Sequence, residues 1–438
     1  MQEDFLRVHK LISEGAPVSI DTRQIKDNAV FFALKGQNFD ANQFARQAID
    51  KGAAIAVVDD PDLPDSNDFI KVENVLDYLQ QLASYHRSLF QIPVIGITGS
   101  NGKTTTKELI NAVLSRKFET HCTQGNLNNH IGVPLTLLGL HKKHQIAIVE
   151  MGANHMGEIA MLSEMAKPTH GIITNIGKAH IEGFGSFENI IRGKTELYQF
   201  LNKNKGTVFL NGDNEILSRA ASGLQCITYG TNKNNTYTGF PVGSDPFLSI
   251  KYKLPEESKT DEQLITISTN LLGDYNFENI MAAIAIGLYF DVQPSEIRQA
   301  IEQYFPKNSR SQLVHTQKNT LFLDAYNANP TSMKAALLNF SASDSELPKA
   351  VILGDMLELG KTAKTEHLEI LNLVNQQQYN YAIFVGEHFS QLATTKNNLI
   401  FRNTAEAARW LENNPIINHT ILIKGSRGIA LEKLLNLL

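Results

Sequence analysis

The stretch GITGSNGKTTTKE, residues 96–108, combines the end of an apolar strand, a glycine-rich turn and the start of a helix. Gly99 and Gly102 allow a tight turn that points backbone amides at an anion, and the dipole of the following helix adds to this attraction. Lys103 can reach terminal phosphates, and the hydroxyl of Thr104 can ligate Mg²⁺. We interpret the stretch as a nucleotide-binding loop.

The loop departs from the strict phosphate-loop pattern, which has a glycine at position 97. This chain has Ile97 there, and the nearest glycine is Gly96. A glycine-rich turn between strand and helix can exist without a ligand, but Gly-Lys-Thr-Thr opening a helix after an apolar strand is a more specific combination. We therefore expect phosphate contacts from Gly99, Ser100, Asn101, Gly102, Lys103, Thr104 and Thr105.

Length and composition predict a globular protein of two or three domains, because the 438 residues are 42% hydrophobic and 19% charged. The net charge of −5 argues against a duplex-binding basic face, so we expect no nucleic-acid partner, but an acidic small-molecule substrate remains possible. Cys122 and Cys226 lack metal-like spacing and are expected to be free thiols. The start of the chain lacks a signal-peptide pattern, and the apolar run 280–290 is too short to span a bilayer, so we expect a cytoplasmic monomer without a membrane span.

The order of apolar and helical segments predicts an α/β protein of three domains. Residues 1–88 read as a small α/β domain, and residues 89–309 repeat strand, loop and helix. The continuous apolar strands of this second segment indicate a parallel sheet covered by helices on both faces, while residues 252–268 have hairpin character. Residues 310–438 predict a third, Rossmann-like α/β domain.

Three more polar residues are placed near strand ends of the predicted central sheet. Glu150 ends an apolar strand, and a carboxylate at the carboxyl end of a parallel strand can hold Mg²⁺ close to bound phosphates. His180 follows the next strand, so we predict a ligand or phosphate role, although a lone histidine is more often a surface or packed residue. Lys194 lies on the following helix, where its charged neighbours by themselves favour a solvent-exposed face.

Motifs over essentially the whole chain resemble those of the Mur ligase family, the ATP-dependent amide ligases of bacterial cell-wall precursor synthesis. The segment 98–108 is similar to the family's nucleotide loop, and VSIDTRQIKDNAVFFALKG (18–36) looks like its UDP-sugar domain. Tyr275 stands where the family often has histidine. The other motifs that carry the resemblance are NLNNHIGVPLTLL (126–138), EMGANHMGEI (150–159), NIGKAHIEGF (175–184), GDYNFENIMAAIA (273–285), DAYNANPTSMKAAL (324–337), ILGDMLELG (352–360) and KGSRGIALE (424–432).

The C-terminal motifs resemble those of family members that add D-alanyl-D-alanine, and the Asp-Asn-Pro-Arg signature of diaminopimelate-adding members is absent from the sequence. The resemblance implies a ligase that uses ATP and Mg²⁺ to join D-Ala-D-Ala to UDP-N-acetylmuramoyl-tripeptide (UDP-MurNAc-tripeptide) through an acyl phosphate. The motifs leave the third residue of the tripeptide open, as diaminopimelate or lysine. Two alternatives are another Mur-type or folylpolyglutamate-type ligase with a different amine, and a nucleotide-dependent transporter subunit or switch.

The resemblance also implies roles for individual residues. We expect Lys103, His180 and Lys194 to be catalytic, and Lys194 matches the family position whose amine is carbamylated by CO₂. The expected metal ligands are Thr104, Glu150, His180 and Lys194. Beyond the loop itself, ATP is expected to contact Asn276, Asn279, Arg310 and Asp324.

The substrates are expected on all three domains. For the UDP end we predict Ser19, Thr22 and Arg23, since an arginine can fork onto phosphate oxygens, although a solvated loop is nearly as plausible there. D-Ala-D-Ala is expected near Asp324, whose carboxylate suits the amine of the dipeptide. The remaining predicted substrate residues are Asn126, Asn128, Asn327 and Asn329.

The adenine assignment has an alternative that the sequence leaves open. Asn276 and Asn279 lie three apart at a helix start, so they share one face, and an amide can donate to and accept from an adenine edge. The alternative is that both residues cap the helix, and we favour the adenine contact.

Overall fold

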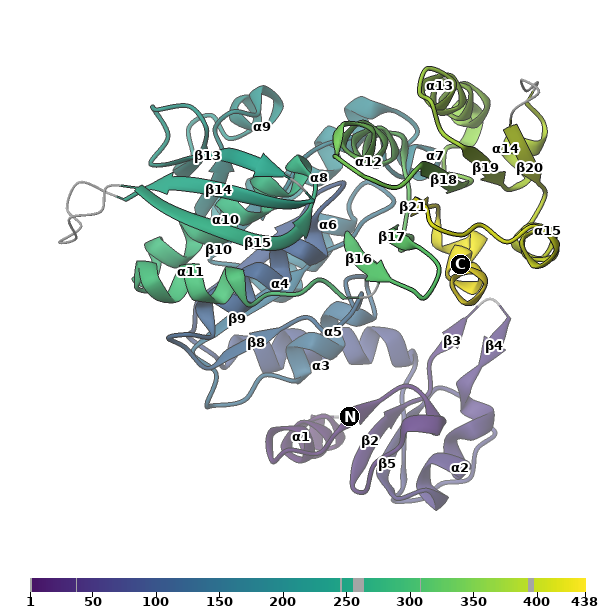
Figure 1. Cartoon of the computed structure of the whole chain (residues 1–438). Coiled ribbons are helices and arrows are strands. Elements are labelled where there is room, and N and C mark those ends of the chain that lie inside the picture. Colours follow the sequence, from purple (N-terminus) through teal and green to yellow (C-terminus); the bar gives the residue numbers. More distant parts are fainter. Residues whose placement is uncertain (1, 37, 245, 255–263, 308, 393–397) are drawn as a thin grey trace.

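The computed structural model of the chain describes residues 2–36, 38–244, 246–254, 264–307, 309–392 and 398–438. Within these ranges the chain forms three α/β units, each built on its own sheet, together with one two-stranded hairpin (Figure 1). The predicted three-domain α/β fold is confirmed. No helix in the described part of the chain is long and apolar enough to cross a bilayer.

The N-terminal unit, purple at the bottom of Figure 1, is a four-stranded parallel sheet in the order β1-β2-β5-β6. Apolar side chains of α3, such as Leu79 and Leu82, share one core with Val133 and Leu137 of the central unit, so this helix joins the two units. The elements are α1 (Gln2–Ser13), β1 (Val18–Ser19), β2 (Ala29–Phe32), β3 (Lys35–Gly36), β4 (Phe39–Asp40), α2 (Ala45–Asp50), β5 (Ala53–Val58), β6 (Phe69–Lys71) and α3 (Val75–Ser88).

The central unit has a nine-stranded sheet in the order β15-β14-β13-β12-β11-β10-β7-β9-β8. Its strands from β8 to β13 are parallel, as the apolar runs predict, and β14 pairs antiparallel with both β13 and β15. The strands are β7 (Val94–Thr98), β8 (Thr120–Cys122), β9 (Ile146–Glu150), β10 (His170–Ile173), β11 (Thr207–Asn211), β12 (Gln225–Gly230), β13 (Tyr237–Ser244), β14 (Phe247–Lys253) and β15 (Leu264–Leu272). The hairpin predicted within residues 252–268 lies partly outside the described residues.

Helices cover both faces of this sheet, which leaves strands such as β7 and β9 buried along their whole length. One face packs on α4 and α10, whose side chains Ile110 and Ile284 share a core with Ile97 and Ile148 of the strands. The helices are α4 (Lys103–Leu114), α5 (Gly132–Leu138), α6 (Glu158–Ala166), α7 (Ile181–Phe184), α8 (Phe187–Lys203), α9 (Glu215–Ala220), α10 (Phe277–Tyr289) and α11 (Pro294–Glu302).

The C-terminal unit, green to yellow in Figure 1, has a six-stranded sheet in the order β16-β17-β21-β18-β19-β20. Only β16 is antiparallel to its neighbour, as in a parallel α/β unit with one added edge strand. Its elements are β16 (Gln312–His315), β17 (Thr320–Asp324), α12 (Pro330–Ala342), β18 (Lys349–Gly354), α13 (Ala363–Asn375), β19 (Tyr381–Val385), α14 (Glu387–Ser390), β20 (Asn398–Phe401), α15 (Thr404–Asn413) and β21 (Thr420–Lys424).

Strand register places the predicted functional residues at two sheet edges. In the central unit Glu150 pairs with Ile97, next to the start of the nucleotide loop. In the C-terminal unit Asp324 of β17 pairs with Lys424 of β21. Because ligands bind outside the carboxyl ends of parallel strands, both edges are suited to binding.

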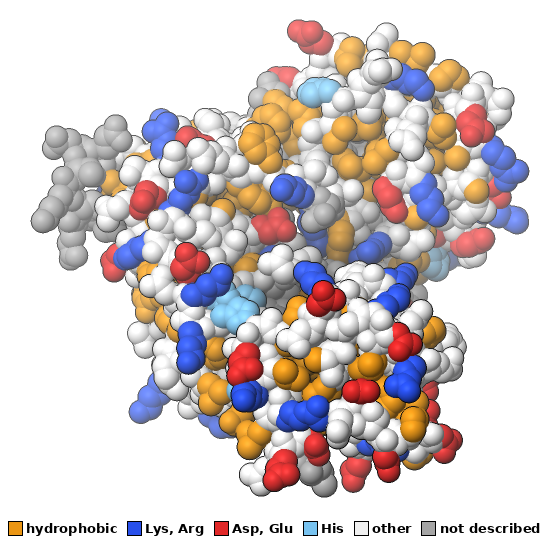
Figure 2. Space-filling view, turned by 90° about the horizontal axis from the view of Figure 1, so that it is seen from below, with side chains coloured by type: hydrophobic (Ala, Val, Ile, Leu, Met, Phe, Trp, Pro, Cys, Tyr) orange, Lys and Arg blue, Asp and Glu red, His pale blue; other side chains and the backbone are white. Residues whose placement is uncertain are grey.

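The surface carries charges of both signs. Lys and Arg side chains are interspersed with Asp and Glu over the described part of the face in Figure 2. Both cysteines are free, as predicted, with Cys122 buried and Cys226 partly buried.

The partly buried His170 predicts a loss of stability in acid. Burial among Phe209, Tyr289 and Phe290 lowers the pKa of this histidine to about 4. Above pH 6.5 this histidine is neutral in the folded and the unfolded state, so its full contribution to stability is present. As pH falls toward 4, the unfolded state binds the proton first, and stability on the order of 3 kcal/mol is lost.

We therefore expect the midpoint of urea unfolding to fall between pH 6.5 and pH 4.5, and to fall less in His170→Phe. The matched control is His315→Gln on the exposed edge of β16, which should follow the wild-type pH dependence. Identical pH dependence of His170→Phe and wild type would contradict the assignment.

Candidate active site

The nucleotide loop runs from the end of β7 to the start of α4 and needs glycine at two positions. Gly99 and Gly102 have φ angles of 142° and 78°, which side chains of L-residues disfavour. A Cβ atom on Gly99 would lie 2.0 Å from Oγ1 of Thr174, and one on Gly102 would lie 2.5 Å from Oδ1 of Asn279. The backbone conformation and the lack of space therefore both require glycine.

Hydrogen bonds to the segment after β10 hold the loop in place. The amide of Ser100 donates to the carbonyl of Asn175 at 2.9 Å, and the amide of Asn101 donates to Oδ1 of Asn175 at 3.0 Å. The hydroxyl of Thr174 donates to the carbonyl of Asn101 at 2.6 Å. These hydrogen bonds hold the loop conformation without a ligand. An anion that binds there therefore requires little reorganisation of the loop.

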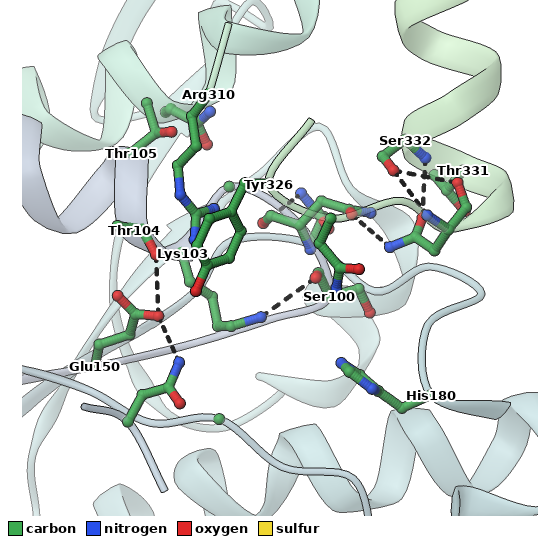
Figure 3. A pocket seen from close by; sticks show the side chains of 18 of the residues that line it. Ser100, Lys103, Thr104, Thr105, Glu150, His180, Arg310, Tyr326, Thr331 and Ser332 are labelled. Carbon is green, nitrogen blue, oxygen red and sulfur yellow. Dashed lines mark hydrogen bonds between the residues drawn. The ribbon is translucent and has the colours of Figure 1, made fainter. Parts of the chain in front are cut away.

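Lys103 begins α4 and turns its ammonium back onto the loop. Its Nζ donates to the carbonyls of Gly99 at 2.8 Å and Ser100 at 3.3 Å (Figure 3). Burial lowers the pKa of Lys103, Glu150 opposes that change, and Arg310 adds to it. The ammonium thus lies against the backbone carbonyls of the loop.

Glu150 ends β9 and brings a carboxylate to the same place. Its Oε1 accepts hydrogen bonds from the hydroxyl of Thr104 at 3.2 Å and from Nδ2 of Asn128 at 2.8 Å (Figure 3). Its Oε2 is buried without a hydrogen-bond partner, and the nearest cation is the Lys107 ammonium at 3.6 Å. This ion pair is itself buried, with side-chain exposures of 2% and 1%.

Thr104 and Glu150 fit a Mg²⁺ ion that also takes oxygens from phosphate and water. An unpartnered buried carboxylate oxygen beside a threonine hydroxyl supplies the hard oxygen donors that Mg²⁺ prefers. No group of three or more His, Cys, Asp or Glu side chains in the described ranges is arranged to hold a metal. His180 also faces the cavity lined by Thr104 and Glu150, and the metal roles of His180 and Lys194 stay predictions.

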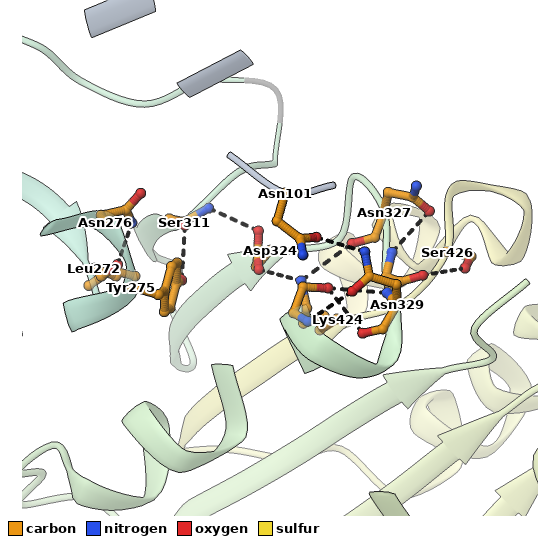
Figure 4. Close-up of polar contacts among 12 residues, drawn as sticks. Asn101, Leu272, Tyr275, Asn276, Ser311, Asp324, Asn327, Asn329, Lys424 and Ser426 are labelled. Atoms are coloured by element: carbon orange, nitrogen blue, oxygen red, sulfur yellow. Dashed lines mark hydrogen bonds and ion pairs between the residues drawn. The ribbon is translucent and has the colours of Figure 1, made fainter. Parts of the chain in front are cut away.

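The cavity has a volume of about 760 Å³ and is lined by the central and C-terminal units. From the C-terminal side, the guanidinium of Arg310 lies 3.6 Å from the ring centroid of Tyr326, and Nε of Arg310 is buried without a partner. Nδ2 of Asn329 donates to Oδ1 of Asn101 at 2.7 Å, which joins the first turn of α12 to the nucleotide loop (Figure 4). The predicted residues that line this cavity are residues 100–105, Asn126, Asn128, Glu150, His180, Asn276, Asn279, Arg310, Asp324, Asn327 and Asn329.

Asn276 and Asn279 reach the cavity wall, but their amides are bonded inside the protein. Nδ2 of Asn276 donates to the carbonyl of Leu272, and its Oδ1 accepts from Nδ2 of Asn279, both at 2.8 Å. Oδ1 of Asn279 accepts from the hydroxyl of Thr106 at 2.9 Å, which ties α10 to α4. Neither side chain caps α10. The geometry therefore supports a role in shaping the loop, and adenine contact stays a prediction.

Asp324 and Lys424 form an ion pair across neighbouring strands, as the register requires (Figure 4). The ammonium of Lys424 also donates to the carbonyl of Asn327 at 3.3 Å, while the amide of Ser311 donates to Oδ1 of Asp324 at 3.3 Å. Asp324 already has a cation and an amide donor, so any ligand at this carboxylate would share it with Lys424.

Lys194 is buried on α8 and is not part of the cavity wall in the described chain. Its Nζ donates to the carbonyl of Ala153 at 3.0 Å and lies 5.3 Å from the ring centroid of Phe184. Burial lowers its pKa well below the usual value, and Lys103 adds to this, while Glu158 and Glu196 oppose it. The surface-helix alternative is therefore wrong for this residue, although its chemical role is not tested.

The predicted UDP residues lie on the N-terminal unit and do not line the cavity. The guanidinium of Arg23 forms a forked ion pair with Asp21, at 2.9 Å from Nε to Oδ1 and 2.8 Å from Nη2 to Oδ2. This pairing lowers the pKa of Asp21 to about 2. Ser19 donates to the carbonyl of Asp21 at 3.0 Å, and Thr22 starts the turn. These residues form a local cluster, and UDP contact stays a prediction.

Two contacts around the candidate site were missed by sequence reasoning. Lys107 lies four residues after Lys103 inside the quoted motif, so its helical spacing was a signal that it follows the nucleotide loop. Glu358 contacts Nδ1 of His180 from the C-terminal unit, and its pKa is lowered mainly by that hydrogen bond. The separation of 178 residues leaves no local sequence signal for this pair.

Comparison with known proteins explains this arrangement. Three family models match consecutive segments: "Mur ligase family, catalytic domain" over residues 16–87, "Mur ligase middle domain" over 97–287 and "Mur ligase, glutamate ligase domain" over 309–427. A UDP-N-acetylmuramoyl-tripeptide–D-alanyl-D-alanine ligase of Bacillus subtilis is 35% identical over 95% of this chain and 92% of its own length. The chain belongs to the Mur ligase family.

Other members of the Mur ligase family agree over a similar length. The ligase of the same name from Escherichia coli is 32% identical, over 96% of this chain and 93% of its own. A crystal structure of MurF from Acinetobacter baumannii superimposes with a TM-score of 0.85 at 29% identity, covering 98% of this chain and 97% of the other. The three-unit arrangement is therefore that of the family.

The tight packing of Gly102 against Asn279 generates a prediction for nucleotide binding. We expect Gly102→Ala to weaken binding of ADP at least about tenfold, because the added methyl group must displace Asn279 or the loop. The matched control is Gly223→Ala, with a φ of 81° but nothing within 4 Å of the added Cβ. Isothermal titration calorimetry of both variants checks this, and equal affinities would contradict the steric argument.

Proposed function

We propose that this chain is an ATP-dependent, ADP-forming ligase that joins D-Ala-D-Ala to UDP-MurNAc-tripeptide in peptidoglycan precursor synthesis. The observation that carries the proposal is 35% identity to the Bacillus subtilis ligase of that name over 95% of the chain. The product is the UDP-linked pentapeptide, with release of ADP and phosphate. The nucleotide loop thus uses ATP to activate a carboxylate.

ATP binding at the central unit is supported by the loop and its charges. The loop between β7 and α4 leads into the N-terminus of α4, where first-turn amides attract an anion, and Lys103 adds a cation within the same turn. The unpartnered Nε of Arg310 adds a buried donor from the C-terminal side. These groups together suit a triphosphate held across the gap between the two units.

Magnesium is proposed at Thr104 and Glu150. The ion would supply charge neutralisation to the phosphates there. Asn128 and Lys107 hold the carboxylate of Glu150 in place, at 2.8 Å and 3.6 Å. These contacts orient Glu150 without using its second oxygen for a hydrogen bond.

The chemistry requires two anions and then an amine to meet in one cavity. The tripeptide carboxylate attacks the γ-phosphorus of ATP, the bond to the β-phosphate oxygen breaks, and ADP leaves. The neutral amine of the dipeptide then attacks the acyl carbon, phosphate leaves with the bonding electrons, and the amine proton passes to solvent. Lys103 lowers the repulsion of the first step by placing a positive charge beside the meeting anions.

The central and C-terminal units bring five of the proposed substrate-binding residues to one cavity. Asn126 and Asn128 line it from the central unit, and Asp324, Asn327 and Asn329 from the C-terminal unit. We place the tripeptide end near the first group and D-Ala-D-Ala near the second. Ser19, Thr22 and Arg23 on the N-terminal unit are the proposed contacts of the UDP end.

The amine specificity tests this proposal. We expect phosphate release from ATP and UDP-MurNAc-tripeptide to be at least about 100-fold more efficient, as kcat/KM, with D-Ala-D-Ala than with D-Ala, L-Lys, diaminopimelate or glutamate. Tripeptides with diaminopimelate or lysine should be compared in parallel. Faster release with another amine would identify a different ligase, and ATP hydrolysis that needs neither acid nor amine would indicate a switch or transporter subunit.

The environment of Lys194 generates a test of the proposed carbamate. Carbamylation needs the neutral amine, and burial beside Lys103 favours that form by lowering the pKa of Lys194. We expect Lys194→Ala to lose most activity, about 100-fold, and formate or acetate to restore part of it by replacing the missing anion.

The control for this rescue is Lys203→Ala at the exposed end of α8. It should keep wild-type activity and should not respond to formate or acetate. Full activity of Lys194→Ala without added carboxylate would remove the carbamate role.

A further inference from the structure

His180 is held by a residue from the opposite unit of the cavity. It lies between β10 and α7, and its Nδ1 contacts the carboxylate of Glu358. Glu358 follows β18 and belongs to the C-terminal unit. Its side chain is 51% exposed, whereas that of His180 is 21% exposed. The contact therefore joins two units that also enclose the reaction cavity.

The backbone at both residues adopts a conformation that such side chains disfavour. His180 has a φ of 54° and Glu358 a φ of 63°. Left-handed conformations of residues other than glycine cost free energy and persist where surrounding contacts impose them, often at functional sites. Here the amide of Glu182 donates to the carbonyl of Glu358 at 3.1 Å, so the backbone itself joins the two loops.

The direction of the contact determines which nitrogen of His180 carries the proton. An ionised carboxylate only accepts, so the bond requires a proton on Nδ1. Nε2 is then the nitrogen with a free lone pair in the neutral ring. No hydrogen bond to Nε2 is formed by the residues that the structure describes, and His180 lines the cavity beside the nucleotide loop.

We propose that Glu358 is a positioning residue that holds His180 with its proton on Nδ1 and Nε2 directed into the reaction cavity. This inference rests on the proposed ligase function and adds a specific link between the two units. Removal of a carboxylate that orients a metal-ligating histidine typically costs 10- to 100-fold in metal affinity or activity, and we expect a loss of the same size here. Because Glu358 belongs to the C-terminal unit, His180 has this orientation only when that unit is docked.

A second ion pair at the same interface provides a matched control. Nζ of Lys178 lies 2.7 Å from Oε1 of Glu366, and the amide of Lys178 donates to Oγ1 of Thr331 at 3.2 Å. Glu366→Gln removes one interface charge, as Glu358→Gln does, but leaves the His180 contact intact. If activity falls only because the two units dock less tightly, the loss should appear in both Glu358→Gln and Glu366→Gln.

The kinetic experiment compares Glu358→Ala, Glu358→Gln and Glu366→Gln. We expect Glu358→Ala to lower kcat about 10- to 100-fold with KM for ATP changed less than about twofold. Glu358→Gln should retain more activity than Glu358→Ala, because its amide oxygen can still accept from Nδ1. Glu366→Gln should remain within about threefold of wild type. Wild-type kcat in Glu358→Ala, or an equal loss in Glu366→Gln, would overturn the proposal.

The tautomer is measured without substrate, so it is independent of the proposed function. In ¹⁵N-histidine-labelled protein at pH 8, with His180→Gln used for assignment, wild type and Glu366→Gln should show His180 protonated on Nδ1. Glu358→Ala should shift the population toward the Nε2-protonated form. An unchanged tautomer in Glu358→Ala would overturn the proposal even if activity fell. If the wild-type protein were inactive with D-Ala-D-Ala while Glu358→Ala still showed the expected tautomer shift, only the proposed function would be refuted.

Discussion

The attachment of the nucleotide loop to the end of β10 is the constraint on which the site depends. Thr174 and Asn175 bond to Ser100 and Asn101, and the same segment leaves no room for a side chain at Gly99. The loop is therefore held by its neighbours in a conformation that the chain would not keep by itself. Because α4 begins directly after it, the loop also determines where Lys103, Thr104 and Lys107 point.

The placement of the nucleotide loop and α4 also leaves several charged side chains buried. Glu150 is enclosed with one oxygen unbonded, and Lys107 and Lys194 are buried with few partners. Buried charges without full compensation cost stability, and binding of oppositely charged ligands offsets this cost. Glu150 thus leaves an unbonded carboxylate oxygen at the edge where phosphates are proposed to bind. The C-terminal unit adds Arg310, whose Nε is unpartnered as well.

Sequence reasoning succeeded where the relevant contacts are made by local motifs or by neighbouring strands. Thr104 and Glu150 were predicted to lie close together as metal ligands, and their side chains are hydrogen-bonded at 3.2 Å because β7 and β9 are adjacent; their binding of Mg²⁺ stays a prediction. It was less informative for the amides of Asn276 and Asn279. Both reach the predicted cavity, but their hydrogen-bonding groups are used by Leu272, Thr106 and each other.

Lys194 shows how tertiary structure changes the reading of a residue. Its charged neighbours along the chain suggested an exposed helix face, whereas α8 packs so that its side chain is 1% exposed. Helical periodicity states which residues share a face, but not which face is covered by α6, α7 and the sheet.

The sequence by itself determined the three α/β units, the nucleotide loop and the family, because these depend on periodicity and on residue types at short spacing. Only the tertiary structure decided the contact of His180 with Glu358 and the bond between Asn329 and Asn101. These partners are separated by 178 and 228 residues, and their meeting depends on how two separately folded units dock. No local pattern encodes the orientation of one unit on another, since it results from the summed packing of both surfaces.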